Sequence, residues 1–589
     1  MPVTPSATRS ETLRPLPRPP ESELNNAQAW RTIRTHPHLF RVVTPINVDR
    51  FEAALALHPN RPLVESVVTG LREGFWPFAD FADLDLPETW EEVHGGLTGD
   101  AASFVASYAL EEEEAGRYSE SFGSRLLPGM MCMPLYAVPK PHSDKLRLVN
   151  DHSAGPYALN SGIRKSDVGM RQDNIQDLGT NLLHLRRSLG DVPVWLFKSD
   201  VANAYRLLPM HPLWQLKQVV HIGDSYRIDR CCCFGCRGSP DLWCTFMSLV
   251  LWIAVEVRKI EGALAYMDDN FGADPNPTLV WYAPYRAFFP SKQVHLLLLW
   301  DDLGIPHKLP KQVFGHSLTI IGFHVDSITM TVTLPPESCA DLVRAIRTFV
   351  LDAPGRKRPL RQWQRILGWI NWGLNVQPLL RPALTSSYNK LRGKIHAARP
   401  MFLNKSVTDD LLWVAEMFET HGGVHLLQSR AWKPCDANLE VFCDACLSGL
   451  GFWSPARHLG FMTSLPAVPD GLDDTIFWFE ALCVLSALHW AASLARPPRR
   501  FAVYTDNLNT VQIFDSFKAS GPYNYILRDA AAILIATGID LRVWHVPGAV
   551  NIVADALSRD MPQVARLYVP NLRILPFQPP RLTLGAVKK

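Results

Sequence analysis

Apolar runs alternate with helical patterns through two long parts of the chain. Between residues 126 and 335, runs typical of β-strands lie at 194–199, 218–222, 263–267, 318–325 and 328–334. From about 436 to 560, the pattern is strand, strand, helix, strand, helices, strand, helix. Because strands and helices alternate in both regions, the sequence predicts a mixed α/β fold built from more than one domain.

The stretch that joins these two regions, within 336–435, is predicted to be helical and basic. Leu360, Trp363, Leu367 and Ile370 recur at helical spacing and define one stripe, so we expect these side chains to lie in a core. Residues 356–405 contain eleven Lys or Arg and no Asp or Glu. Positive charge without nearby acids is typical of a groove that follows a nucleic-acid backbone.

The two ends of the chain lack such periodicity. Both ends are rich in proline: residues 1–30 are predicted to be a disordered tail, and residues 561–589 a proline-rich tail. Residues 31–125 show short helical patterns, and the acidic run Glu111 to Glu114 is expected to be a solvated helix face.

Composition sets limits on the class of protein. The 589 residues are 47% hydrophobic and 20% charged, with a net charge of +2, which allows a large core and excludes a histone-like polycation. No apolar run is expected to reach the ~18 residues of a membrane span, and the N-terminus does not look like a signal peptide. We therefore expect an intracellular protein without membrane contact, in the nucleus or the cytoplasm.

The eleven cysteines do not resemble a disulfide scaffold, because their number is odd and they are sparse for the length. Four of them crowd together at Cys231, Cys232, Cys233 and Cys236. Cys233 and Cys236 have the spacing of one zinc-binding pair, but no second pair lies near in the sequence. We therefore favour reduced, packed thiols over a metal site.

The first candidate centre is acidic. Asp268 and Asp269 are adjacent between two apolar runs, which fits the turn of a β-hairpin. Asp200 ends the apolar run at 194–199 and is a candidate third carboxylate. Like charges so close are costly unless a cation compensates them, and three carboxylates can hold two Mg²⁺ ions for phosphoryl transfer. An isolated Asp-Asp turn, by contrast, is usually only solvated.

This ordered set of motifs resembles the reverse transcriptases of LTR-type and related retroelements. Asp200 to Tyr205 resembles their first catalytic motif, and Tyr266 to Asp269 resembles the YxDD box. The resemblance covers about 126–335 and implies the fingers and palm of a right-hand polymerase. It also implies that the backbone of Val201 joins Asp200, Asp268 and Asp269 around the metal ions.

Further matches imply substrate contacts. Tyr205 resembles the steric gate that selects dNTPs over rNTPs, and Phe234-Gly235-Cys236-Arg237 resembles the motif that supports the template and the incoming nucleotide. The remaining residues with an implied substrate-binding role are Lys140, Arg147, Tyr266 and Lys311. Ile321 to His324 resembles the primer grip. Two departures from the family are Phe234, where many relatives carry Gln, and Asn203, where some carry Asp.

A second acidic set lies in the C-terminal region. Asp444 ends one predicted strand, Glu480 begins a helix and Asp506 ends another strand, while Asp555 lies in a later helical stretch. The order of these acids, with His545-Val546-Pro547-Gly548 and Ala554 to Arg559, resembles the RNase H domain of retroelements, especially LTR and DIRS-like ones. One departure is Gly548 and Ala549, where some relatives place a catalytic histidine.

The resemblance as a whole implies six segments: a tail at 1–30, an N-terminal helical region at 31–125, fingers and palm at 126–335, a basic thumb and connection at 336–435, an RNase H-like domain at 436–560 and a tail at 561–589. The implied enzyme is an RNA-directed DNA polymerase that also cleaves RNA in RNA–DNA hybrids. Its partners are RNA or DNA template-primers and dNTPs, and each active site uses two Mg²⁺, or Mn²⁺ in vitro. The alternatives are a non-catalytic nucleic-acid-binding remnant of a retroelement and a chain that keeps only the nuclease.

Overall fold

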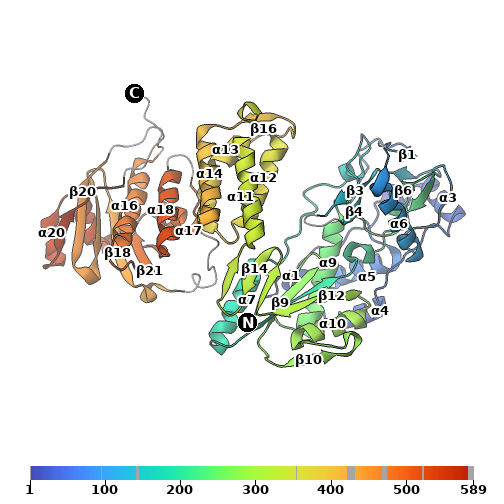
Figure 1. Cartoon of the computed structure of the whole chain (residues 1–589), viewed down its shortest axis with the longest axis horizontal. Helices are drawn as coiled ribbons and strands as arrows, with labels where there is room; N and C mark the ends of the chain where they lie inside the picture. Colours follow the sequence, from blue (N-terminus) through green and yellow to red (C-terminus); the bar gives the residue numbers. More distant parts are fainter. Residues whose placement is uncertain are drawn as a thin grey trace. The chain divides into compact units, whose positions relative to one another are not determined.

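A computed structural model describes residues 2–580 except 94–95, 141–144, 353, 421–431, 467–471, 473 and 520–522. The chain divides into two compact units (Figure 1). The first unit comprises Met1–Ile321 and Asp326–Thr329, and the second comprises Gly322–Val325 and Met330–Lys589. Both contain helices and strands, so the predicted mixed α/β class is confirmed.

The first unit begins with short helices and contains most of the strands. Its helices are α1 (Pro5–Ser10), α2 (Glu21–Leu24), α3 (Ala27–Thr35), α4 (Val48–Ala54), α5 (Arg61–Glu73), α6 (Gly99–Glu114), α7 (Ile175–Leu189), α8 (Pro212–Gln215), α9 (Ser239–Trp252) and α10 (Ser291–Leu303). Its strands are β1 (Trp90–Glu91), β2 (Met131–Cys132), β3 (Leu135–Pro139), β4 (Leu146–Asn150), β5 (Trp195–Val201), β6 (Val219–Ile222), β7 (Ser225–Ile228), β8 (Leu264–Tyr266), β9 (Asp269–Asp274), β10 (Leu279–Tyr282), β11 (Ala287–Pro290), β12 (His307–Gly315) and β13 (Ser317–Ile320).

The second unit has a helical part followed by a sheet. After β14 (Phe323–Asp326) and β15 (Thr331–Thr333), its helices are α11 (Pro336–Leu351), α12 (Leu360–Gly373), α13 (Thr385–Leu391), α14 (Lys405–Thr420), α16 (Thr475–Ala492), α17 (Leu508–Ser516), α18 (Tyr523–Thr537), α19 (Ile552–Ser558) and α20 (Pro562–Tyr568). Its further strands are β16 (Lys357–Pro359), β17 (Pro400–Phe402), β18 (Leu439–Ala445), β19 (Gly449–Ser454), β20 (Leu459–Ser464), β21 (Arg500–Thr505), β22 (Asp540–His545) and β23 (Arg573–Pro576).

A four-stranded sheet in the order β12-β5-β9-β8 forms the centre of the first unit. Strands β5 and β9 are antiparallel, and their register places Asp200 opposite Asp269. Strands β8 and β9 form a hairpin in which Tyr266 pairs with Asp269. The predicted hairpin at the Asp-Asp turn is therefore confirmed. The run at 263–267 forms β8, its first strand, and the run at 194–199 forms β5, which pairs with its second strand, β9.

Two helices, Ser239–Val257 and Thr475–Ala492, are long and apolar enough to span a bilayer by length and composition. The expectation that no apolar run reaches that length is therefore wrong. In each, 67% of the most apolar window is buried inside the protein, because α9 lies in the core of the first unit and α16 in that of the second. A helix enclosed on most sides has no need of a polar face.

The N-terminal segment, residues 2–16, is ordered, so the prediction of a disordered tail at 1–30 is wrong. Helix α1 packs on α9, and Ala7 and Leu16 are buried in the core. The fully buried carboxylate of Asp173 accepts hydrogen bonds from the backbone and hydroxyl of Ser6, both at 2.8 Å, and from the backbone of Ala265 in β8 at 3.0 Å. The sequence does not indicate that this segment is ordered, because its order comes from contacts with distant parts of the chain rather than from local periodicity.

The C-terminal prediction needs a similar correction. Residues 562–568 form α20, and β23 pairs in parallel with β20 as the edge strand of a six-stranded sheet. The domain predicted to end at 560 therefore extends at least to Pro576. Residues 581–589 of the predicted tail lie outside the described residues.

The six-stranded sheet of the second unit has the order β22-β21-β18-β19-β20-β23. Strands β22, β21 and β18 are parallel, and β19 is antiparallel to both of its neighbours. Alternate side chains such as Leu450 and Phe452 face a core with α16 and α18, whereas Trp453 packs with α19. Helices therefore cover both faces of the sheet.

The part of the second unit that precedes this sheet is helical, as predicted. Leu360, Trp363, Leu367 and Ile370 of α12 are buried, which confirms the predicted stripe. Trp363 packs edge to face on Phe349 of α11. The predicted segment 336–435 also includes residues 421–431, which lie outside the described residues.

We predict that Asp173→Ala lowers the free energy of unfolding of the first unit by about 2–4 kcal/mol, because it leaves buried N–H and O–H groups without an acceptor. Urea unfolding of the full chain measures the effect. Asp167→Ala is the control, since Asp167 is exposed and accepts one bond from Ser166. Equal effects of the two substitutions would show that Asp173 does not anchor the N-terminal segment.

Candidate active sites

The turn of the β8–β9 hairpin is held in an uncommon conformation. Met267 has a φ of 54°, in the left-handed region that two-residue hairpin loops require but that residues other than glycine rarely adopt. Gln172 accepts a hydrogen bond from the Met267 N–H at 2.8 Å, and the Trp243 indole donates to the Met267 carbonyl at 2.9 Å. These two side chains fix the turn that carries Asp268.

The structure brings the three predicted carboxylates of the first unit together. Asp200 and Asp269 face each other across β5 and β9, and Asp268 lies on the adjoining turn. Two lysines offset part of this negative charge. The ammonium of Lys311 lies 3.0 Å from the Asp200 carboxylate, and that of Lys198 lies 2.9 Å from Asp269.

The electrostatics of this cluster are those of crowded acids. Surrounding protein that removes part of its hydration, followed by the neighbouring Asp200 charge, raises the pKa of Asp268 to about 6, although much of the residue remains exposed. Burial also raises the pKa of Asp269, against the opposing effect of Lys198. Such groups favour a cation among them, because a cation removes the repulsion between the charged forms.

Beside the carboxylates, three predicted substrate residues contact one another; we call this group the stack, although its two rings are tilted by 45° rather than parallel. The ring centroids of Tyr205 and Phe234 lie 4.9 Å apart. The guanidinium of Arg147 lies over the Phe234 ring, 4.8 Å from its centroid. Gly235 has φ of 120°, and a Cβ atom there would lie 1.7 Å from the Asn150 carbonyl oxygen. Glycine thus allows this loop to approach β4.

The other predicted residues of the first unit differ in their surroundings. Lys140 directly follows β3, its N–H donates to the Lys145 carbonyl, and residues 141–144 lie outside the described residues. Tyr266 is exposed, and Val201 bonds the Asp268 carbonyl through its N–H. The guanidinium of Arg237 donates to the carbonyls of Asn160 and Ile163, so this side chain braces the loop rather than facing the stack.

The cysteine cluster has the character of packed thiols. Cys231, Cys232, Cys233 and Cys236 are all buried, and burial raises the pKa of each thiol. None of them belongs to a group of potential metal ligands among the described residues. The packing expected of these thiols is therefore what the structure shows.

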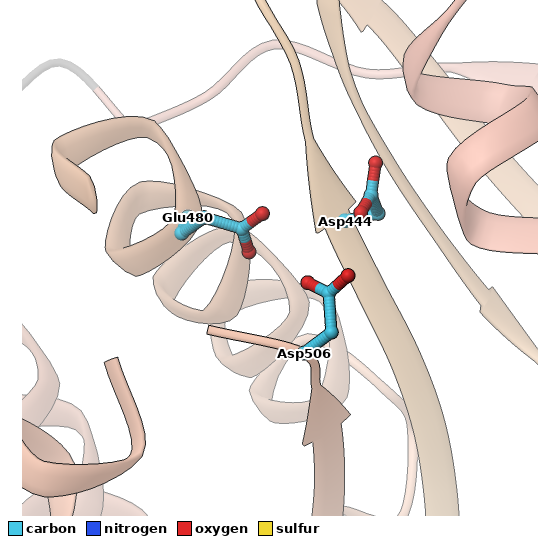
Figure 2. A group of neighbouring side chains, drawn as sticks. All are labelled: Asp444, Glu480 and Asp506. Carbon is cyan, nitrogen blue, oxygen red and sulfur yellow. The ribbon is translucent and has the colours of Figure 1, made fainter. Parts of the chain in front are cut away.

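In the second unit, Asp444, Glu480 and Asp506 converge (Figure 2). Each offers an oxygen, and these oxygens all lie within 4.8 Å of one another. Asp444 lies near the end of β18 and Asp506 follows β21, so both occupy the carboxyl edge of parallel strands. Glu480 reaches the same edge from α16.

Hydrogen bonds hold this second cluster in place. The Glu480 carboxylate accepts from the Ala445 N–H at 3.1 Å and from the Thr505 hydroxyl at 3.0 Å. Burial, with the Asp444 charge second, raises the pKa of Glu480 to about 8. Burial likewise raises the pKa of Asp444 to about 6, although the Ser558 hydroxyl donates to it at 2.5 Å.

Asp555 lies beside this cluster but outside the group of three described above. Its carboxylate pairs with Arg559 at 2.7 Å, and its charge still acts on Asp444. Helix α19, which carries Asp555, can sit close to the sheet because Gly451 has no side chain. A Cβ atom there would lie only 2.5 Å from the Ser558 nitrogen. The four predicted acids thus occupy one region, and three of them are close enough to share an ion.

Both clusters fit a hard divalent cation by their donor chemistry. They offer carboxylate oxygens, which Mg²⁺ prefers, and burial raises the pKa of Asp268, Asp444 and Glu480, so that their charged forms are disfavoured without a cation. Among the described residues, the carboxylates close enough to share one ion are those of Asp444, Glu480 and Asp506. Asp200, Asp268 and Asp269 lie together but do not form such a group, and neither does Asp555 with the other three.

Comparisons with known proteins found no matching family model and no matching curated protein. Three solved structures of a foamy viral protease-reverse transcriptase align with the chain at 15% identity. The dRH form with double-stranded DNA gives a TM-score of 0.43, covering 78% of this chain and 72% of that chain. The complex with an RNA/DNA hybrid gives 0.41, covering 79% and 55%. Another complex with double-stranded DNA gives 0.43, covering 86% and 98%.

Sequence reasoning missed several residues that shape these sites. Lys198 lies two residues before Asp200 in β5 and therefore on the same face of the strand, so its place near the carboxylates could have been predicted from the sequence. Gln172 and Trp243 gave no such signal, because they reach the hairpin from distant segments. Glu112 was expected on a solvated face, yet it is only 3% exposed and pairs with Arg117 and Arg206.

We predict that Glu480→Gln stabilises the protein in EDTA, increasingly so as the pH rises. The folded-state pKa of about 8 exceeds the usual 4.5, so the stability that the protonated Glu480 contributes is lost as the pH rises through this interval. Glutamine retains the shape without the charge, and at pH 9 we expect a gain of about 1–3 kcal/mol.

Thermal unfolding at pH 5 and pH 9 measures this difference. Glu416→Gln, at an exposed position of α14, is the control and should change the unfolding midpoint little at either pH. A Glu480→Gln midpoint that follows the wild type across this pH range would contradict the prediction.

Proposed function

We propose that this chain is an RNA-directed DNA polymerase that also cleaves the RNA strand of RNA–DNA hybrids. The observation that carries the proposal is the β5–β9 register, which sets Asp200 opposite Asp269 with Asp268 on the next turn, beside the Tyr205–Phe234–Arg147 stack. The order of motifs in the sequence supports an origin in an LTR-type or DIRS-like retrotransposon.

In the proposed polymerase, the first unit supplies the fingers and palm, and the helices of 336–435 supply the thumb and connection. Bound Mg²⁺ ions would lower the pKa of the attacking 3′-hydroxyl and stabilise the leaving pyrophosphate. Asp200, Asp268 and Asp269 would hold these ions, with the backbone of Val201. The cationic side chains of Arg147, Lys140 and Lys311 would bind the triphosphate of the incoming nucleotide.

Sugar selection is assigned to the ring stack. Tyr205 is only 7% exposed and rests against Phe234, so its ring has little freedom to move away from a 2′-hydroxyl. Phe234 cannot donate a hydrogen bond to the nucleotide, as a glutamine would. We infer that packing, rather than hydrogen bonding, fixes the floor of the nucleotide pocket here.

In the second unit, Asp444, Glu480, Asp506 and Asp555 would hold two divalent ions at the carboxyl edge of the sheet. This arrangement suits hydrolysis of a phosphodiester, for which carboxylates keep the ions in place and orient water. The basic segment 356–405 would contact the phosphates of the template-primer duplex, and its affinity should decrease as salt increases.

Primer extension on a defined RNA template, with Mg²⁺ and dNTPs, tests the polymerase. We predict that Asp268→Asn/Asp269→Asn reduces incorporation by about 10³-fold or more, because it removes the charge that holds the ions. Asp83→Asn/Asp85→Asn changes two exposed aspartates and should extend like the wild type. Equal, background extension by wild type and double variant would favour the non-catalytic remnant instead.

The two activities should separate. We predict that Asp506→Asn reduces cleavage of a labelled RNA–DNA hybrid by about 10²-fold or more, while primer extension changes little, since the two carboxylate clusters belong to different units. Asp515→Asn, at an exposed position of α17, is the matched control. Loss of both activities in Asp506→Asn would argue against two independent centres, and hybrid cleavage without any extension by the wild type would leave only the nuclease.

A further inference from the structure

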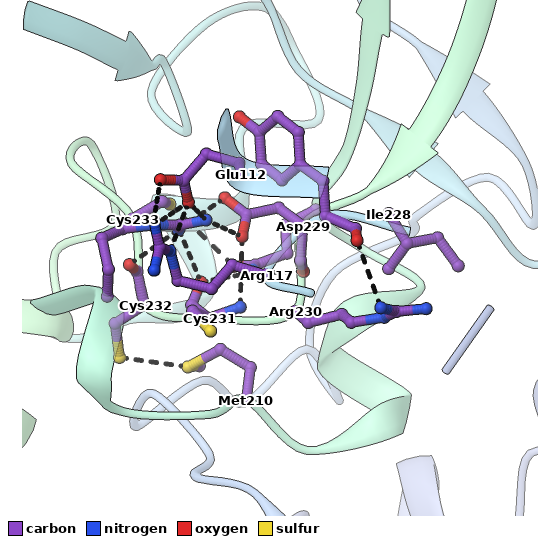
Figure 3. A network of polar contacts seen from close by, with 12 residues as sticks. Glu112, Arg117, Met210, Ile228, Asp229, Arg230, Cys231, Cys232 and Cys233 are labelled. Atoms are coloured by element: carbon purple, nitrogen blue, oxygen red, sulfur yellow. Dashed lines mark hydrogen bonds and ion pairs between the residues drawn. The ribbon is translucent and has the colours of Figure 1, made fainter. Parts of the chain in front are cut away.

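A buried arginine lies next in sequence to the proposed sugar gate. Arg206 follows Tyr205 in a short 3-10 helix, Ala204–Leu207, and is only 5% exposed. Its guanidinium donates to the Glu112 carboxylate at 2.7 and 2.9 Å and to Asp229 at 2.9 Å. Arg117 also pairs with Glu112, so Arg117, Glu112, Arg206 and Asp229 form a chain of ion pairs. Figure 3 shows Glu112, Arg117 and Asp229 of this chain.

The same guanidinium reaches the loop on the other side of the proposed pocket. It donates to the carbonyls of Cys231 at 3.3 Å and Cys232 at 3.0 Å, two residues that lead directly to Phe234. Asp229, in turn, accepts from the Cys231 N–H at 3.1 Å. Figure 3 shows the backbone of Cys231 to Cys233 beside Glu112 and Asp229.

Arg206 therefore joins three segments that are distant in the sequence. One is helix α6 through Glu112, the second is the turn that carries Tyr205, and the third is the Cys231–Cys232 segment before Phe234. A backbone hydrogen bond from Cys232 to the Leu208 carbonyl at 2.9 Å links the second and third segments again. The Tyr205 ring belongs to the second segment and the Phe234 ring follows the third, and the two ring centroids lie 4.9 Å apart.

We propose that Arg206 is a positioning residue that sets the separation of Tyr205 and Phe234, and thereby the discrimination between deoxyribonucleotides and ribonucleotides. This inference rests on the proposed polymerase function. Arg206 has no contact with the reacting groups. It acts by preventing the Tyr205 turn and the Phe234 loop from moving apart when a 2′-hydroxyl presses on the ring.

The chemistry of guanidinium explains why arginine is required. Its planar fork presents five donors in fixed directions, enough to bond two carboxylates and two carbonyls at once. A lysine at this position keeps the charge but has three donors on a flexible stem, so it cannot span the same partners. Removing the charge altogether would leave Glu112 with only Arg117 and would take from the buried Asp229 its ion pair with Arg206, which is strongly destabilising.

The test compares Arg206→Lys and Glu112→Gln with the wild type in primer extension with single dNTPs and rNTPs. We expect Arg206→Lys to lower the ratio of kcat/KM for dNTP to that for rNTP by about tenfold, mainly through KM. Glu112→Gln should lower it less, since it frees the arginine from α6 but leaves its bonds to the Cys231 and Cys232 carbonyls. Tyr205→Ala provides the scale for a fully relaxed gate.

Arg230→Lys is the matched control. Arg230 is also buried, and it donates to the carbonyls of His38, Leu39, Gly116 and Tyr118 rather than to the network around Arg206. This variant should lose stability, as judged by thermal unfolding, without a change in the dNTP to rNTP ratio. Cleavage of hybrid RNA by each variant reports whether the second unit remains intact.

The outcomes separate the inference from the function on which it rests. Suppose that the wild type extends primers. Arg206 then has no positioning role if Arg206→Lys keeps the wild-type ratio of kcat/KM for dNTP to that for rNTP, or if Arg230→Lys lowers this ratio equally. If Arg206→Lys is too unstable to assay, the Glu112→Gln ratio decides in the same way. A wild type that incorporates no nucleotide overturns the polymerase proposal, and the role of Arg206 in sugar selection with it.

Discussion

The repulsion between carboxylates that are forced together is the constraint on which this structure depends. Sheet register in the first unit and the edge of parallel strands in the second hold acids close enough to raise several of their pKa values. Folding alone gives no reason to gather such charges, because isolated acids are better hydrated at the surface. The surrounding packing must therefore be strong enough to hold them, and the buried cores beneath both clusters provide it.

The two centres manage this repulsion differently. In the first unit, Lys311 and Lys198 reach the carboxylates as mobile partners on flexible stems. In the second, Glu480 is fixed by an N–H and a hydroxyl, and its burial leaves the charge poorly compensated. Lysine ammonium groups thus pair with the carboxylates of the first centre, whereas neutral N–H and O–H donors hold the Glu480 carboxylate of the second.

Much of the fold and most of the candidate site residues could be predicted from the sequence, because strand ends and turns mark them locally. The Asp200 strand and the Asp268 hairpin show this, as does the buried stripe of α12. The failures share one cause. The N-terminal segment, strand β23 and the burial of Glu112 all depend on partners far along the chain, such as Asp173, β20 and Arg206. Composition and periodicity describe a segment alone and carry no information on such partners.

Anomalous diffraction from crystals of the full chain with a template-primer and Mn²⁺ would test the central claim most directly. The account predicts manganese peaks at about 2.1–2.2 Å from carboxylate oxygens in two places, among Asp200, Asp268 and Asp269 and among Asp444, Glu480 and Asp506. Peaks at neither cluster, with Lys311 and Lys198 still paired to Asp200 and Asp269, would contradict it.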